Sequence, residues 1–397
     1  MSQPLFTSTP DNEKPNPTNV GGQAVIEGVM MRAPGALSVV CRKRDGSLIL
    51  RERTITPPTS AVLKAPLIRG AYTLFSSLKI GHQALRFSAE ILEEGLAEEE
   101  AREAEKQATE RAAAKKAAST KAPPGPATLA MLSVAQWVLA AGDDKGGGSM
   151  SPDDKKSAMA GFAMALPILF AIGLFIALPQ LAAEGINSWL GLGLDVRSPG
   201  FQVITGAAKL TIIVSYLAGI RMIPDVKRVF QYHGAEHKSI STYEAGKELL
   251  VENARPTTAL HARCGTTFII MVAFVSVVLF SAVGSFFPQV PAPRWVQSIA
   301  FFVMKLPLFP VIAGITFELQ RFFARHCSTG PLQFLLWPGF LVQKITTAPP
   351  DDDQLEVALA SLRSALANAP VQLPESHPDR SYTSYSALVS DVVPRPA

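Results

Sequence analysis

The chain has 397 residues, of which 48% are hydrophobic and only 18% are charged, with a formal net charge of +4. Because soluble domains average about 25% charged residues, this composition favours a membrane protein. The cysteines are too few and too scattered for a disulfide framework and fit a reducing compartment: Cys41, Cys264 and Cys327.

The N-terminal part is predicted to be cytoplasmic. Residues 1–20 are polar and lack the apolar run of a signal peptide, so we expect a disordered tail. Residues 21–58 are predicted to form a small β-unit. Two runs rich in Val, Ile, Leu and Thr flank the turn signal Arg44-Asp45-Gly46-Ser47, and Pro57-Pro58 ends the unit.

Two helical or flexible segments follow this β-unit. Residues 62–94 are predicted to contain an amphipathic helix that lies on the membrane surface or packs under the membrane bundle. Residues 95–156 are predicted to be a charged, flexible insertion. Its acidic and basic residues are mixed and its charged part has no aromatic residues, so we expect no nucleic-acid partner.

Residues 157–320 are predicted to form a membrane domain of four spans, because each of four segments is long and apolar enough to cross a bilayer. The spans are Met159–Ala183, Phe201–Ile220, Thr266–Phe287 and Val296–Phe317. The run 268–280 has no polar face, which argues against buried helices of a soluble protein. The predicted fold class is therefore an α-helical polytopic membrane protein with a small N-terminal cytoplasmic β-hairpin unit.

The distribution of Lys and Arg predicts the orientation. Residues 221–263, between the second and third spans, hold seven of them, whereas residues 184–200 and 288–295 hold one each. Because positive residues stay on the cytoplasmic side, we expect this middle segment and both termini to be cytoplasmic.

The segment 221–265 contains the main candidate site. His233, Glu236 and His237 have the spacing i, i+3 and i+4, which places them on one face of a helix. Two imidazoles and a carboxylate are typical of a divalent metal site, and one class of zinc peptidases uses this spacing. The alternative is that the two histidines pair or cap locally at the membrane boundary.

The second motif of this segment, His261-Ala262-Arg263-Cys264-Gly265, directly precedes the third span. If this site catalyses a metal-assisted hydrolysis, His233 and His237 hold the metal, which is expected to be zinc. His261, Cys264 or Glu244 completes the ligand set, because imidazole, thiolate and carboxylate all suit zinc. Glu236 acts as the general base on a water that the metal activates.

Further polar residues of these motifs are expected to support the site. Glu27 is the one acidic residue in an apolar strand, and it either forms a salt bridge with Arg32 or belongs to the site. The other supporting candidates are Gln23, Arg263 and Lys238.

Lys209 and Lys305 lie inside predicted spans. Charge within a membrane is costly and marks a functional candidate, but both lysines can instead snorkel to the outer surface, which we favour. Pro307 and Pro310 predict a kink in the fourth span, which can open a polar cavity.

The C-terminal part is expected to return to the cytoplasmic side. Residues 328–370 are predicted to hold a segment that dips into the interface and then an amphipathic helix over Leu355–Ala367. Residues 371–397 are predicted to be a disordered tail.

The motifs resemble those of the bacterial YqhQ family, DUF1385 membrane proteins. The resemblance rests on the run Gly21–Arg32, the cluster Tyr232–Lys238, the His261–Gly265 element and three later stretches: Gly314–Glu318, Trp337–Phe340 and Asp351–Ala358. It covers about residues 21–370 and implies a multi-pass protein of the bacterial plasma membrane. The family is described as metal-dependent enzymes, a label that itself rests on motifs.

Three functions remain open from the sequence. The leading one is metal-assisted hydrolysis of a membrane-associated substrate at a cytoplasmic-face site. The second is a non-catalytic factor for membrane-protein insertion or assembly, in which the same polar groups bind a protein partner. The third is transport through the polar groups of the spans, which four spans without an inverted repeat support least.

Overall fold

The structure, a computed structural model, describes residues 20–56, 58, 60–118, 170, 173–327, 331–368 and 377–392. It divides into two units, one made of residues 1–93 with 173–397 and the other of residues 94–172. Of the predicted tail 1–20, only Val20 lies within the described residues.

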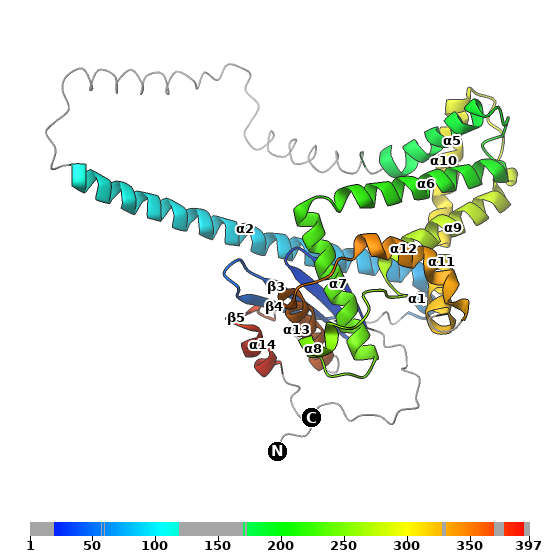
Figure 1. Ribbon diagram of the computed structural model, residues 1–397. Helices are drawn as coiled ribbons and strands as arrows, with labels where there is room; N and C mark the ends of the chain where they lie inside the picture. The colour runs from blue at the N-terminus through cyan, green and yellow to red at the C-terminus, as the bar shows by residue number, and fades with distance from the viewer. Residues whose placement is uncertain are drawn as a thin grey trace, which may run out of the picture. The chain divides into compact units, whose positions relative to one another are not determined.

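An antiparallel sheet lies at the centre of two apolar clusters of the first unit (Figure 1). The strands are β1 (Gly21–Val25), β2 (Gly28–Ala33), β3 (Ala36–Arg42), β4 (Leu48–Thr54) and β5 (Arg380–Tyr382), in the order β1-β2-β3-β4-β5. The predicted hairpin joins β3 to β4, where Gly46 has a φ of +87° that the tight turn requires. The N-terminal β-unit is thus confirmed, and it is larger than a hairpin.

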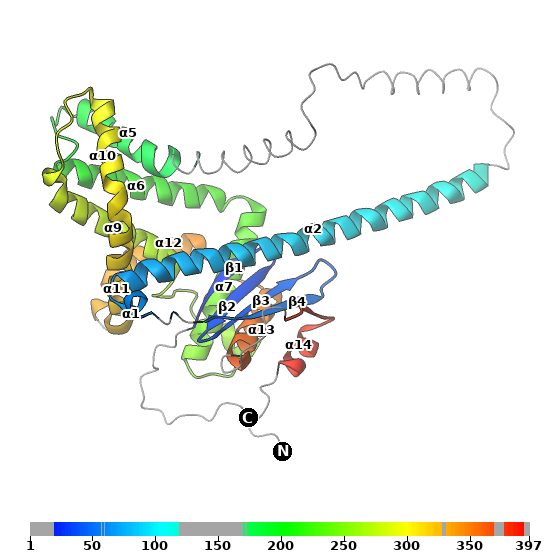
Figure 2. The ribbon, with the colours of Figure 1, turned by 180° about the vertical axis from the view of Figure 1, so that it is seen from behind.

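Helices cover both faces of the sheet, because its strands alternate apolar residues toward both sides. On one face, Val29, Met31 and Val40 pack with α13 (Asp352–Asn368) and α7 (Pro224–Glu244). On the other, Met30 and Val39 belong to a second apolar cluster together with Ala84, Phe87 and Ile91 of α2 (Ile68–Ala118) (Figure 2).

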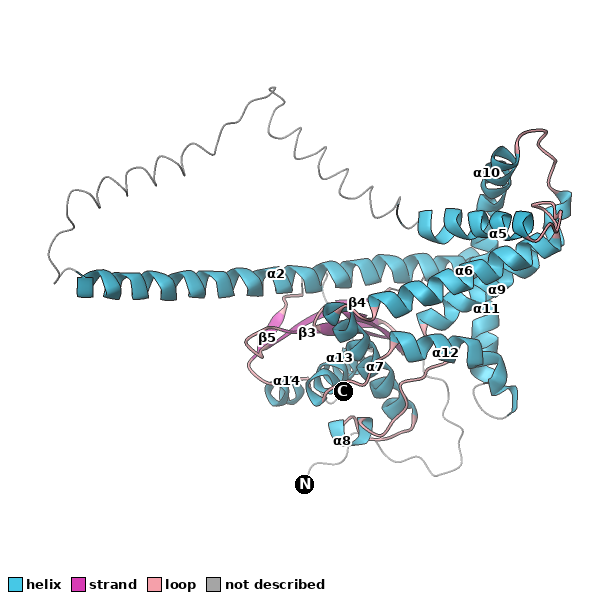
Figure 3. Cartoon of the chain, turned by 45° about the horizontal axis from the view of Figure 1, so that its top comes forward, coloured by secondary structure: helices cyan, strands magenta, loops and turns pink. Residues whose placement is uncertain are grey.

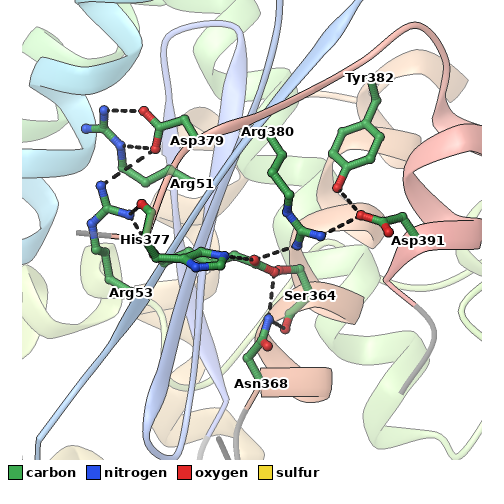
Figure 4. Close-up of polar contacts among 10 residues, drawn as sticks. Arg51, Arg53, Ser364, Asn368, His377, Asp379, Arg380, Tyr382 and Asp391 are labelled. Atoms are coloured by element: carbon green, nitrogen blue, oxygen red, sulfur yellow. Dashed lines mark hydrogen bonds and ion pairs between the residues drawn. The ribbon is translucent and has the colours of Figure 1, made fainter. Parts of the chain in front are cut away.

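The prediction of a disordered C-terminal tail over 371–397 is wrong for residues 377–392. They form β5, which pairs with β4, and α14 (Tyr385–Asp391). The buried carboxylate of Glu52 on β4 joins this segment to α13, since it accepts hydrogen bonds from Arg380 at 2.6 Å and, on α13, from Ser364 at 2.5 Å and Asn368 at 2.6 Å. Figure 4 shows these three donors converging. Long-range pairing to an acid far upstream leaves no local pattern in the sequence.

Helix α2 differs from the predicted surface helix over 62–94. A short helix, α1 (Ala61–Lys64), precedes it, and α2 extends to Ala118, into the segment predicted as a flexible insertion. Its first part packs against the sheet, but Phe75 and Leu78 remain 71% and 63% exposed. The rest of the predicted insertion, 119–156, lies outside the described residues.

Among the described residues, three helical segments are long and apolar enough to cross a membrane: Pro199–Ile220, Gly265–Phe286 and Val296–His326. They comprise α6 (Pro199–Ile220), α9 (Gly265–Val283) with η2 (Gly284–Phe286), and most of the run α10 (Arg294–Lys305), η3 (Leu306–Leu308) and α11 (Phe309–His326). The turn η3 interrupts the last run at Pro307, where the sequence predicts a kink. Three of the four expected spans are therefore confirmed as candidates.

The first expected span, Met159–Ala183, lies largely outside the described residues. Its end forms η1 (Gly173–Ala177) and the beginning of α5 (Leu178–Trp189). Helix α5 packs against α6, α6 packs against α9, and α9 packs against α11, as Figure 3 shows.

The remaining helices connect the bundle to the sheet. Helix α8 (Val251–Ala254) lies in the segment between α7 and α9, and η4 (Pro331–Leu336) leads into α12 (Trp337–Thr346). Pro338 lies in the first turn of α12, where a missing N–H costs nothing. The helix therefore continues, and it packs against α9. The predicted helix over Leu355–Ala367 corresponds to α13, which is buried between α7 and the sheet.

Lys305 lies inside the bundle rather than at its surface. Its side chain is 6% exposed, its Nζ donates to Gln202 Oε1 at 2.9 Å, and it lies 4.1 Å from the ring centre of Phe301. Lys305 and Lys209 both line a cavity of about 50 Å³. The snorkelling expected for Lys305 is therefore wrong in this structure, because the amide of Gln202 and the aromatic rings hold its ammonium group.

Candidate metal centre

Helix α7 presents the three residues of the main motif on one face, as their spacing predicts. Glu236 and His237 are 5% and 1% exposed, and His233 is half-buried. The ring centres of His233 and His237 lie 4.4 Å apart. The helix follows α6 directly, so the motif lies near the end of a candidate span.

Cys264 completes a group of three potential metal ligands. The nitrogen atoms of His233 and His237 and the Sγ atom of Cys264 lie within 4.8 Å of one another. The Nε2 atom of His233 is 3.3 Å from this Sγ. Cys264 also caps the N-terminus of α9, where its Sγ accepts from the N–H of Thr266. The thiol therefore has a structural role as well as a place in the cluster.

Backbone carbonyl groups orient both imidazoles of this group. The Nδ1 atom of His233 is 2.8 Å from the carbonyl oxygen of Thr346, and Nδ1 of His237 bonds to that of Ala259. A carbonyl oxygen only accepts, so each Nδ1 carries the proton and each Nε2 keeps its lone pair in the neutral ring. Metal-binding histidines typically have this arrangement.

Two glycines allow the close approaches that build the site. A Cβ at Gly234 would lie 2.2 Å from the carbonyl oxygen of Ala348, so only glycine lets the strand-like segment after α12 reach α7 and His233. A Cβ at Gly22 on β1 would lie 2.8 Å from Cγ of Glu236. The glycine-rich strand therefore lies beside the acidic residue of the site.

Without a metal, the electrostatics of the cluster favour a thiolate next to imidazolium, whose Nε2 proton a metal ion would replace. Burial opposes charge on Cys264, but hydrogen bonds from His233 and His237 hold its pKa well below the usual value. Burial likewise opposes charge on His233, but the hydrogen bond and negative charge of Cys264 raise its pKa. The thiolate is the form in which cysteine binds metals.

Glu236 lies in a different environment from these ligands. Burial raises the pKa of its carboxyl group, and the charges of His237 and His233 partly oppose that shift. Among the described residues, none forms a hydrogen bond or ion pair with its side chain. A buried carboxyl group with a raised pKa and free oxygen atoms is suited to accept and release a proton.

The other two expected ligands lie beside the cluster and bind each other. His261 Nε2 is 3.3 Å from Oε2 of Glu244, the last residue of α7, and Arg263 pairs with the same carboxylate. Burial lowers the pKa of His261. Its ring centre is 5.8 Å from that of His237. The structure therefore brings Cys264, rather than His261 or Glu244, into the three-ligand group.

The residues expected to support the site contact different parts of the structure. Lys238 holds the loop after α8, because its Nζ donates to the carbonyl groups of Arg255 at 2.6 Å and Thr257 at 2.7 Å. Arg263 forms an ion pair with Glu244, which in turn contacts His261. Glu27 pairs with Arg228 and accepts a hydrogen bond from Tyr232 at 3.2 Å, so the predicted pair with Arg32 is wrong.

Gln23 and Arg32 point away from the cluster. The strand period places Gly22 on the α7 side of β1, so Gln23 faces α2, where its amide lies against Gly81. Arg32 occupies the α2 side of β2, beside Met30. Neither side chain belongs to the ligand group.

Sequence reasoning missed two glutamines that fix the second motif. Gln343 on α12 is fully buried, and it accepts from the N–H of His261 at 2.8 Å while donating to its carbonyl group at 2.8 Å. Gln320 on α11 donates to the carbonyl group of Cys264 at 3.1 Å. For Gln343, an amide within the apolar run of α12 was the available signal, because buried amides need partners.

Comparison with known proteins agrees with the resemblance of the motifs. The chain is 28% identical over 358 residues to "Uncharacterized protein YqhQ" of Bacillus subtilis (strain 168), which covers 88% of this chain and 93% of that protein. No solved structure matches the chain. Residues 65–368 match the family described as "Protein of unknown function (DUF1385)". This match spans most of the sequence, so the chain belongs to the DUF1385 family.

Proposed function

We propose that this protein is a metal-dependent, hydrolase-like membrane enzyme that acts on a membrane-associated substrate. The observation that carries the proposal is the convergence of His233, His237 and Cys264, whose ligand atoms lie within 4.8 Å of one another. They come from two elements at the ends of two candidate spans. The helical spacing explains why the two histidines lie close together, but it does not explain why the thiol of Cys264 lies beside them.

The ligand chemistry favours zinc. Two imidazole nitrogens and one thiolate form a three-ligand set that zinc enzymes use, with a fourth position open to water or substrate. The fixed Nδ1 atoms of both histidines leave Nε2 available. Zinc would supply Lewis acidity, which lowers the pKa of water toward about 7.

Glu236 would hold and move the proton in this reaction. Its carboxyl group is buried beside the ligands, and no described residue forms a hydrogen bond with it. Gly22 leaves the space in which its side chain lies. Glu236 thus has the position and the free oxygen atoms of a general base.

Metal analysis of the purified full-length protein tests this proposal. We expect about one equivalent of zinc in the wild type, and loss of most of it in His233→Ala, His237→Ala and Cys264→Ala. His82→Ala, at an exposed position of α2, is the matched control and should retain the metal. Wild-type protein purified without chelators and carrying no stoichiometric metal would refute the hydrolase proposal.

We further propose that the protein lies in the bacterial plasma membrane with both termini and this site on the cytoplasmic side. The Lys and Arg content of residues 221–263 supports this orientation. Cysteines introduced at the exposed positions Ser188 and Lys247 test it, because the three native cysteines are buried. A membrane-impermeant thiol reagent added to intact cells should label the first position only; labelling of the second would reverse the orientation.

The second candidate function is a non-catalytic platform for membrane-protein insertion or assembly. It is favoured by the structural bonds of the same residues, since His233, His237 and Cys264 tie α7, α9, the end of α12 and the loop at Ala259 together. A platform spreads its binding energy over many contacts, so Glu236→Gln should cost it about 1–3 kcal/mol. Overexpression of that variant would then restore growth in a complementation assay, whereas lost catalysis would persist.

A further inference from the structure

A polar pocket of about 210 Å³ lies between β2, α1 and the beginning of α2. Three cationic side chains line it, those of Arg32, Lys64 and Arg69. Three hydroxyl groups complete the lining, those of Tyr72, Thr73 and Ser76. No acidic residue is part of this lining among the residues that the structure describes. The pocket is therefore suited to an anion.

The three cationic side chains of this pocket differ in whether they have an acidic partner. Arg69 binds Glu318 with two hydrogen bonds, of 2.7 and 2.6 Å. Within the described part of the chain, neither Arg32 nor Lys64 forms an ion pair or a side-chain hydrogen bond. Arg32 is half-buried and remains charged at neutral pH, and an unpaired buried charge is costly. An anionic ligand would offset this cost.

The position of Arg32 follows from the register of the sheet. Met30 and Arg32 point to the same side of β2, and Met30 packs in the apolar cluster beneath α2. Arg32 continues that row toward Tyr72, at the point where the interface between sheet and helix becomes polar. An apolar residue would extend the cluster without leaving a charge unpaired, so packing alone does not explain the arginine.

The surroundings place this pocket against α11, the second half of a candidate span. Leu67 and Gly70 contact Gly314 of α11, and Arg69 binds Glu318 four residues further along this helix. The segment around the pocket also exposes large apolar side chains to solvent: Val62, Leu67, Ile68, Phe75 and Leu78. Apolar side chains next to unpaired cations are typical of a surface that meets both acyl chains and headgroups.

We propose that this pocket binds the phosphate group of an anionic membrane phospholipid. Arg32 and Lys64 donate to the phosphate oxygens, and the hydroxyl groups of Tyr72, Thr73 and Ser76 complete the site. The exposed apolar residues of α1 and α2 contact the acyl chains. The inference is independent of the metal centre, since Arg32 and Lys64 lie outside the ligand group.

Native mass spectrometry of the detergent-solubilised full-length protein tests the proposal. Dioleoyl phosphatidylglycerol is titrated against dioleoyl phosphatidylcholine, which carries the same acyl chains but no net charge. We expect selective retention of the anionic lipid and about tenfold weaker binding in Arg32→Gln and in Lys64→Gln, because each loses one charge-assisted hydrogen bond. Lys64 is exposed, so its substitution does not threaten folding.

Arg86→Gln is the matched control, because it removes the same charge from an exposed position of α2 that pairs with Glu90. Its lipid binding should equal that of the wild type. Equal binding by all three variants, or equal retention of the two lipids, would overturn the proposal. Complete displacement of the lipid by millimolar glycerol phosphate would overturn the lipid as the source and assign the pocket to a soluble phosphate compound.

Discussion

Glu52 and Glu236 are two carboxyl groups buried in the same unit, and their surroundings differ sharply. Glu52 is 2% exposed and lies within reach of four side chains that donate to or pair with its oxygens, those of Ser364, Asn368, His377 and Arg380. Glu236 is 5% exposed and has no such partner among the described residues. A carboxylate whose oxygens accept several hydrogen bonds joins parts of a fold, whereas one without such partners keeps its oxygens available for chemistry.

The largest expected effect separates the two acids by function. Glu236→Gln should reduce turnover by about 10²- to 10⁴-fold, because a positioned general base typically contributes that much. The protein should still insert, bind zinc and unfold at its wild-type temperature, since no described hydrogen bond is lost. Growth in a complementation assay, measured at normal and at several-fold raised expression, checks this. Full rescue at the raised level would count against catalysis.

The corresponding change at Glu52 should affect stability instead. Glu52→Ala leaves Arg380 without its buried partner and releases β5 and α14 from the sheet. Breaking a buried ion pair by removing one partner costs about 3–5 kcal/mol. Thermal unfolding in detergent measures the loss, and metal content serves as the control, because Glu52 lies outside the ligand group. An unchanged unfolding temperature would contradict the role assigned to this network.

The two acids also differ in how far the sequence reveals them. The spacing of His233, Glu236 and His237 predicts their shared helical face, and hydropathy predicts four spans, three of which match candidate spans among the described residues. These patterns are local, so they survive in the sequence alone. Glu52 meets partners more than 300 residues away, and no local period indicates such a contact.

The same limit applies within the metal centre. The sequence left the third ligand open between His261, Cys264 and Glu244, because side chains from a loop have no fixed period. The choice of Cys264 depends on where α9 begins and on how Gln343 and Gln320 hold the preceding loop. The carbonyl groups of Thr346 and Ala259 are equally invisible in the sequence, since every residue carries one.

A smaller effect is expected from the glycine beside Glu236. Gly22→Ala places a Cβ 2.8 Å from Cγ of Glu236 and 2.8 Å from the carbonyl oxygen of Met30. Overpacking of this kind costs about 1–3 kcal/mol, and it displaces the carboxyl group, so both stability and activity should fall. Gly21→Ala is the matched control, because nothing lies within 4 Å of its Cβ. Equal behaviour of the two variants would show that the strand does not constrain Glu236.

The smallest expected effect comes from removing one hydrogen-bond donor to Glu52 while the acid itself is kept. The Nδ2 atom of Asn368, at the end of α13, donates to Oε1 of Glu52 at 2.6 Å, while Ser364 and Arg380 bind the same carboxylate. Because these donors remain in Asn368→Ala, the carboxylate stays satisfied and the variant should lose only about 1 kcal/mol, the net contribution of one hydrogen bond. Thermal unfolding of Asn368→Ala and Glu52→Ala under the same conditions compares the stability that each variant loses. Equal losses would mean that the network depends on this single hydrogen bond. The presence of several donors would then not be what distinguishes Glu52 from Glu236.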